Sequence, residues 1–187
     1  IWLGLVGSEM CIRDRNHPER VRTLIPVMTT SGDPSLPPAT PEATAALTAV
    51  PEERTPDAIA DLAVKGRAVY GSHPDIRTPD DEIRANAIAA MQRSDRPMGT
   101  ARQYAAILAQ PRWHERLTTL DVPTLVLHGE MDTLILPAAG QDIARRVPGA
   151  KIEIIEKWGH DLSEAVMPVL LNRIVPFLGQ TTPAGEY

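Results

Sequence analysis

Two ionisable side chains in the C-terminal third of the sequence could transfer a proton together. Asp132 lies three residues after Gly129, where the apolar run PTLVLHG ends, and His160 ends the segment KWGH. Both follow predicted strands that are consecutive in the chain, so in a parallel sheet their loops open at the same edge. A carboxylate that binds an imidazole fixes the ring tautomer. It also stabilises the imidazolium formed when the ring takes a proton from a nucleophile.

Several nearby residues offer alternatives to this pair. Glu130 and Asp161 flank the two positions, and either carboxylate could be the acid in place of Asp132. Asp132 could also be only a turn or cap residue. His128 is predicted to pack inside the strand. The remaining histidines lie in polar or proline-rich segments and are predicted to be solvated: His17, His73 and His114.

Predicted strands and helices that alternate along the chain position the two candidate residues. A continuous apolar run predicts a strand covered on both faces, and short helices and a second strand follow it with brief connections. This order predicts a parallel α/β unit with right-handed crossovers. The predicted elements are a strand at 123–129, a helix at 136–149, a strand at 150–160 and a closing helix at 163–178.

The N-terminal half of the sequence predicts one strand followed by several helices. Residues 21–30, VRTLIPVMTT, are β-branched and apolar and predict a buried strand, although Pro26 lacks a ladder donor. From residue 33 to about residue 120 the pattern predicts several helices and no strand. Thr55 and Thr78 are the expected N-caps of two of these helices. Large side chains at helical spacing are predicted to form the core of this section rather than to line a pocket: Tyr70, Met91, Met98 and Tyr104.

The segments LVLHGEMDTLILP and IEIIEKWGHDL resemble the last third of the α/β-hydrolase family, whose chain order is nucleophile, acid, histidine. The segment VMTTSGDPSLPPATPEA further resembles the esterase branch related to aclacinomycin methylesterase. The resemblance implies an α/β fold, the C-terminal part of an α/β-hydrolase parallel sheet with a helical lid insertion. By the same resemblance, Asp132 is the triad acid and His160 the general base.

This resemblance also implies a division of the chain. The partial hydrolase core is expected at 16–32 and 121–180, the helical lid at 33–120 and a disordered tail at 181–187. Residues 5–15, LVGSEMCIRDR, resemble a translated sequencing adapter, so 1–15 are expected to be a non-native leader. Cys11 and Ser8 in this leader are therefore given no functional role.

The family's nucleophile motif G-x-S-x-G does not occur in this sequence, since VGSEM lacks the second glycine. The chain is therefore predicted to be the C-terminal part of a serine carboxylic-ester hydrolase that is inactive by itself. The expected partner is a small-molecule ester, without a cofactor or a metal. The exposed apolar edge left by the absent strands is expected to favour aggregation.

Bulk composition narrows the function classes. A net charge of −5 without a Lys/Arg cluster argues against nucleic acid, and no apolar run approaches the roughly 20 residues of a membrane span. A soluble protein is expected, with a cytoplasmic location favoured; substrate identity and oligomeric state stay open. Alternatives are an epoxide or haloalkane hydrolase with an Asp nucleophile, a lactonase, or a non-enzymatic binding protein of the same fold.

Overall fold

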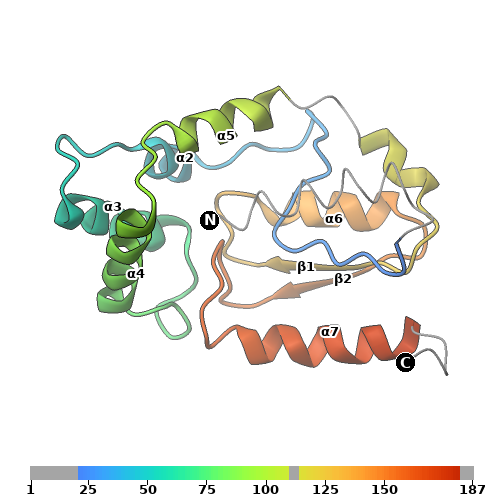
Figure 1. Ribbon diagram of the computed structural model, residues 1–187. Coiled ribbons are helices and arrows are strands. Elements are labelled where there is room, and N and C mark those ends of the chain that lie inside the picture. Colours follow the sequence, from blue (N-terminus) through green and yellow to red (C-terminus); the bar gives the residue numbers. More distant parts are fainter. Residues whose placement is uncertain (1–20, 110–113, 182–187) are drawn as a thin grey trace.

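The computed structural model describes residues 21–109 and 114–181, and the fold divides into an α/β part and a helical section (Figure 1). The helical section comprises α2 (Pro41–Thr48), α3 (Pro56–Tyr70), α4 (Asp80–Arg93), α5 (Gly99–Leu108) and the 3-10 helix η2 (His114–Thr119). The α/β part comprises β1 (Leu125–Gly129), α6 (Pro137–Arg146), β2 (Lys151–Ile155) and α7 (Met167–Thr181). The predicted leader 1–15, His17 and residues 182–187 of the predicted tail lie outside the described residues.

The two strands form a parallel pair, as the sequence predicts. Their register runs from Leu125 opposite Lys151 to Gly129 opposite Ile155. Helix α6 connects the strands and lies on one side of them, while α7 lies on the other side (Figure 1). The predicted α/β fold class is confirmed. Because both strands run in the same direction, the loops that follow them open together toward α3 and α4.

Alternation along β1 supplies a core on each side of the pair. Successive side chains of a strand point to opposite faces, so Val126 packs toward α6 whereas Leu125 and Leu127 pack toward α7. All five residues of β1 are buried. The α6 side contains Leu24, Leu117, Leu120, Val126, Ile143 and Val147; the α7 side contains Met28, Leu125, Leu127, Ile155, Trp158, Val166, Leu170 and Phe177.

Residues 21–30 do not form the predicted regular strand. They run parallel to β1 but make only two isolated bridges, from Leu24 to Thr124 and from Val27 to Leu127. Pro26 has no N–H to donate, and Met28 has a positive φ of 46° that turns the chain out of extended geometry. The segment still pairs with β1, because the carbonyl of Pro26 accepts from the Leu127 N–H at 2.9 Å.

The helical section follows the predicted cap chemistry in part. Thr55 caps α3, since its hydroxyl accepts from the Ala58 N–H at 3.2 Å and proline follows at the first helical position. The expectation for Thr78 is wrong. Helix α4 begins one residue later with Pro79 at the cap position and no side-chain cap bond, and three acidic residues in its first turn interact with the helix dipole instead.

Burial within the helical section differs from the prediction for two side chains. Tyr70 is buried as expected, and Met91 is half-buried. Met98 and Tyr104 are exposed, so the prediction that they belong to a core is wrong. Helix α5, which carries Tyr104, has no buried residue among those described. Helical spacing shows which side chains share a face, but it does not show whether another element covers that face.

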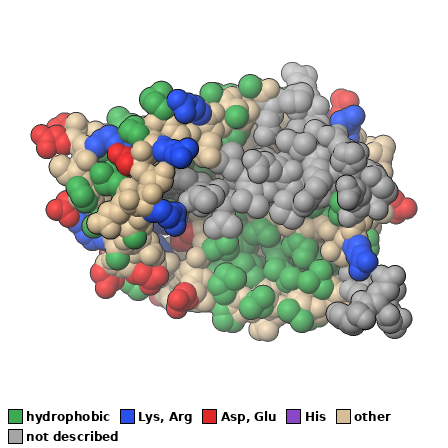
Figure 2. Space-filling view, viewed as in Figure 1, with side chains coloured by type: hydrophobic (Ala, Val, Ile, Leu, Met, Phe, Trp, Pro, Cys, Tyr) green, Lys and Arg blue, Asp and Glu red, His purple; other side chains and the backbone are tan. Residues whose placement is uncertain are grey.

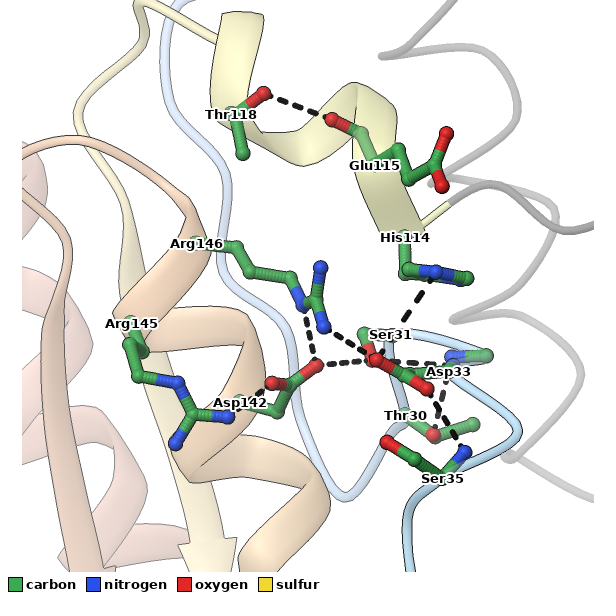
Figure 3. A network of polar contacts seen from close by, with 11 residues as sticks. Thr30, Ser31, Asp33, Ser35, His114, Glu115, Thr118, Asp142, Arg145 and Arg146 are labelled. Atoms are coloured by element: carbon green, nitrogen blue, oxygen red, sulfur yellow. Dashed lines mark hydrogen bonds and ion pairs between the residues drawn. The ribbon is translucent and has the colours of Figure 1, made fainter.

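A polar network joins both ends of the helical section to α6 (Figure 3). Arg146 of α6 donates to Asp142 at 2.6 Å and to Asp33, which precedes α2. The Ser31 hydroxyl donates to Asp142 at 2.5 Å. At the other end, Nε2 of His114 in η2 lies 4.0 Å from Asp33 Oδ2. His114 is buried, so the prediction that it is solvated is wrong.

The surface of α7 carries exposed hydrophobic side chains. Met167, Leu171 and Val175 follow one another at intervals of four residues, and hydrophobic atoms gather on the lower part of the face in Figure 2. Within the described residues, no helix has the length and apolar character needed to cross a membrane.

Candidate active site

Asp132 and His160 meet in the loops that follow the two parallel strands. Their side chains contact each other directly, with Asp132 Oδ2 2.8 Å from His160 Nδ1. The Asp132 side chain is 0% exposed and that of His160 is 12% exposed. Because Nδ1 faces the carboxylate, Nε2 is the ring nitrogen that can exchange a proton with another group.

Backbone groups hold the Asp132 carboxylate in place. Its Oδ1 atom accepts the N–H groups of Leu134 at 2.9 Å and Ile135 at 2.8 Å, in the manner of an Asx turn. These two bonds occupy one carboxylate oxygen and leave the other directed at His160. The loop that contains Asp132 leads directly into α6, so the position of this helix also determines where the Asp132 carboxylate lies.

His128 lies beneath the pair, buried in β1 as predicted. Its Nε2 is 2.7 Å from the carbonyl oxygen of Ile135 and 3.5 Å from Asp132 Oδ2. The ring fits because α6 has a glycine opposite it. A Cβ on Gly140 would lie 2.6 Å from His128 Nδ1. The sequence places His128 in the strand, but gives no sign that its ring reaches the acid four residues later.

Opposing effects act on the pKa of Asp132. Burial raises this pKa, while hydrogen bonds from His128 and His160 and the N–H of Ile135 lower it. The hydrogen bonds outweigh the effect of burial, and the pKa of Asp132 lies below the ordinary value for aspartate. An anionic carboxylate is therefore maintained next to His160, where it can stabilise a charged imidazolium.

The other carboxylates considered from the sequence are placed differently. Glu130 is exposed. Asp161 turns away from the ring and accepts hydrogen bonds from the N–H and hydroxyl of Ser72 in the helical section. The geometry therefore favours Asp132 as the partner of His160.

The buried serines of the described residues have other partners. The hydroxyl of Ser31 donates to Asp142, that of Ser72 to Asp161 and that of Ser163 to the carbonyl of Ile76. The part of the chain that the structure describes also has no cluster of three or more side chains able to hold a metal ion. The described site thus brings together one carboxylate and one imidazole in direct contact.

A carboxylate and an imidazole joined at the carboxyl ends of adjacent parallel strands, with helices on both faces, are typical of the α/β-hydrolase class. The model of one family, described as serine aminopeptidase, S33, matches residues 40–164. This range is about two thirds of the chain. The chain belongs to this family.

Solved structures of hydrolases share the fold. A thermophilic esterase from Thermogutta terrifontis matches with a TM-score of 0.66 and 23% identity over 95% of this chain and 63% of its own. The enol-lactonase from Burkholderia xenovorans LB400 matches with a TM-score of 0.64 and 19% identity over 94% of this chain and 63% of its own.

A meta-cleavage product hydrolase from Pseudomonas fluorescens IP01 matches with a TM-score of 0.64 and 16% identity over 94% of this chain and 62% of its own. The chain therefore spans less than two thirds of the length of these structures. The search of curated proteins returned no match.

Proposed function

We propose that this chain is the acid–histidine part of a serine carboxylic-ester hydrolase. The observation that carries the proposal is the 2.8 Å contact between Asp132 Oδ2 and His160 Nδ1 in the loops after two adjacent parallel strands. Membership of a serine hydrolase family supports it. The nucleophilic serine and the oxyanion-hole donors would lie in a segment outside this chain, which covers about 62% of the length of the solved hydrolases.

In the proposed reaction, the serine oxygen attacks the ester carbonyl while Nε2 of His160 takes the serine proton. Asp132 stabilises the resulting imidazolium through Nδ1. The imidazolium then gives its proton to the departing alcohol, which leaves an acyl-serine. Water attacks this acyl group, His160 accepts the water proton and returns it to the serine, and the carboxylic acid is released.

The helical section is proposed to cover the substrate as a lid. Its turn at residues 70–73 contacts the loop that carries His160, which places the section beside the reacting groups. The proposed substrate is a carboxylic ester of modest size, in keeping with the resemblance to the aclacinomycin methylesterase branch. The chain alone is proposed to be inactive, because removal of a triad nucleophile costs about 10⁶ in kcat.

A lactone is the second candidate substrate. Two structures of the same fold are described as an enol-lactonase and as an N-acyl homoserine lactone degrading enzyme. Ring opening of a lactone is the same acyl transfer, except that the alcohol stays attached to the acid. Comparing acyclic esters with lactones of equal carbon number would decide between the two.

The experiment uses the enzyme translated from the complete upstream reading frame, assayed with p-nitrophenyl esters of short acids. We expect His160→Ala to lower kcat/KM by at least about 10³ and Asp132→Asn by about 10²–10⁴. His73→Ala is the matched control, because the His73 side chain is partly exposed and its Nδ1 atom pairs with Asp75, away from the Asp132–His160 contact. Full activity in the His160→Ala enzyme would overturn the proposal.

A further inference from the structure

Asp161, the residue next to His160, binds the helical section instead of the imidazole. We infer that Asp161 is a positioning residue for His160 and acts by fastening the loop 157–161 to Ser72. This inference rests on the proposed role of His160. It assigns a function to a carboxylate that the sequence offered only as an alternative acid.

The Ser72 hydroxyl binds both neighbours of His160 in the chain, Gly159 and Asp161. The N–H of Gly159, before the histidine, donates to Ser72 Oγ at 3.0 Å. Ser72 Oγ in turn donates to Asp161 Oδ1, after the histidine, and the Ser72 N–H donates to Asp161 Oδ2 at 3.2 Å. Both side chains are almost fully buried, with residue exposures of 5% for Ser72 and 6% for Asp161. Buried bonds of this kind are costly to lose because water does not replace them.

Backbone bonds extend the same attachment. The N–H of His160 donates to the carbonyl of Tyr70 at 2.7 Å, and the N–H of His73 donates to the carbonyl of Lys157 at 2.8 Å. The Trp158 indole donates to the Asp161 carbonyl at 2.6 Å. The position of the His160 backbone, and with it the distance from Nδ1 to Asp132, therefore depends on residues 70–73.

Two glycines allow the segments to touch through their backbones. A Cβ on Gly159 would lie 2.2 Å from the carbonyl oxygen of Gly71. A Cβ on Gly71 would lie 2.4 Å from the Arg67 carbonyl oxygen and 3.0 Å from Asp161 Oδ2. The backbones of residues 70–73 and of the loop 157–161 therefore pack directly against each other, with no space for a side chain at either glycine. Any movement of the helical section that displaces residues 70–73 must also move His160.

An exposed ion pair between the same segments provides a matched control. Lys157 Nζ donates to Asp75 Oδ2 at 2.6 Å, and both side chains are about half exposed. Exposed pairs contribute little because water and salt screen them. Asp75→Ala thus removes a link between the two segments without disturbing the buried one.

The test is NMR of the ¹⁵N-labelled enzyme translated from the complete upstream reading frame, observing the His160 side-chain nitrogens and the exchange rate of the His160 amide. We expect Ser72→Ala and Asp161→Ala each to accelerate this exchange roughly tenfold and to weaken the Nδ1–H signal of the bond to Asp132. The double variant should be no worse than the worse single one, because both changes break one link. Asp161→Asn keeps one of the two acceptor oxygens and should change both readouts less than Asp161→Ala does. Asp75→Ala should change neither readout.

Wild-type His160 signals in Ser72→Ala would overturn the inference, and this variant decides the matter if Asp161→Ala does not fold. Equal acceleration at the Leu127 amide in the centre of β1 would also overturn it, because the substitution would then only lower global stability. Failure of the proposed function gives a different result. The ester hydrolase assay would be insensitive to His160→Ala, whatever the NMR variants show.

Discussion

At the scale of single residues, Asp132 is the buried charge on which the site depends. Its two carboxylate oxygens have different partners. One accepts two backbone N–H groups, and the other faces His160 and His128. The carboxylate is stable in a buried position because these N–H groups replace the hydrogen bonds that water would make.

The lowered pKa of Asp132 predicts acid sensitivity. A folded-state pKa below the unfolded value of about 3.9 adds stability above that pH, and this contribution is lost as the pH falls through the folded pKa. Asp132→Asn should therefore be less stable than wild type by about 1–3 kcal/mol at pH 7. The difference should shrink below about pH 4, as measured by urea unfolding from pH 7 to pH 3.

Asp142 and Asp33, whose pKa values are also lowered, titrate in both proteins, so their contributions cancel in that comparison. An Asp132→Asn difference that is constant from pH 7 to pH 3 would contradict the explanation by ionisation.

Gly140 provides a second prediction at this scale. An added methyl group would press against the His128 ring, so Gly140→Ala should destabilise the fold by about 1–3 kcal/mol. Gly179 in α7 is the control, because it is exposed and a Cβ there meets no atom of the described residues within 4 Å. Gly179→Ala should be neutral or stabilise by up to about 1 kcal/mol. Thermal unfolding of the two variants distinguishes these effects, and equal stabilities would contradict them.

At the scale of elements, α6 connects the sheet to the ends of the helical section. Arg146 binds Asp142 within the helix and Asp33 outside it, and Ser31 completes the network from the segment beside β1 (Figure 3). Burial raises the pKa of Asp142, but hydrogen bonds from Arg146, Ser31 and Arg145 together outweigh it and hold this pKa below its ordinary value.

Removal of Asp142 should be costly. Asp142→Ala would leave Arg146 and the buried Ser31 hydroxyl without their common acceptor, and we expect a loss of about 3 kcal/mol in urea unfolding. Asp95→Ala is the matched control, since it removes the exposed ion pair with Arg54 and should cost about 0.5 kcal/mol. Similar losses for the two variants would show that the network does not stabilise the fold.

The elements near the site could be predicted from the sequence because their patterns are local. A continuous apolar run gave β1, Pro137 marked the start of α6, and the chain order placed Asp132 and His160 at one edge. The burial of His114 could not be predicted, because it depends on Asp33 and Arg146, which are distant in sequence. The same holds for Ser72, whose role depends on a turn that reaches the His160 loop.

At the scale of the whole molecule, the described surface predicts self-association. Met167, Leu171 and Val175 expose a hydrophobic stripe along α7 (Figure 2). Leu171→Lys should lower the fraction of oligomer at micromolar concentration in sedimentation velocity. Val50→Lys, at an exposed position in the helical section outside this stripe, should leave it unchanged. A monomeric wild-type chain would contradict this expectation.

The network around Arg146 brings together the two points where the polypeptide leaves and rejoins the sheet layer. The side chains of Asp33 and His114 approach each other, with Nε2 of His114 4.0 Å from Asp33 Oδ2. A short linker that replaces the intervening residues would therefore incur little loop-closure entropy. If the helical section is the proposed lid, a different helical section grafted at this junction should change substrate specificity. The graft would also have to supply a hydroxyl group in place of that of Ser72. Without it, the loop that carries His160 would lose its buried attachment in the chimaera.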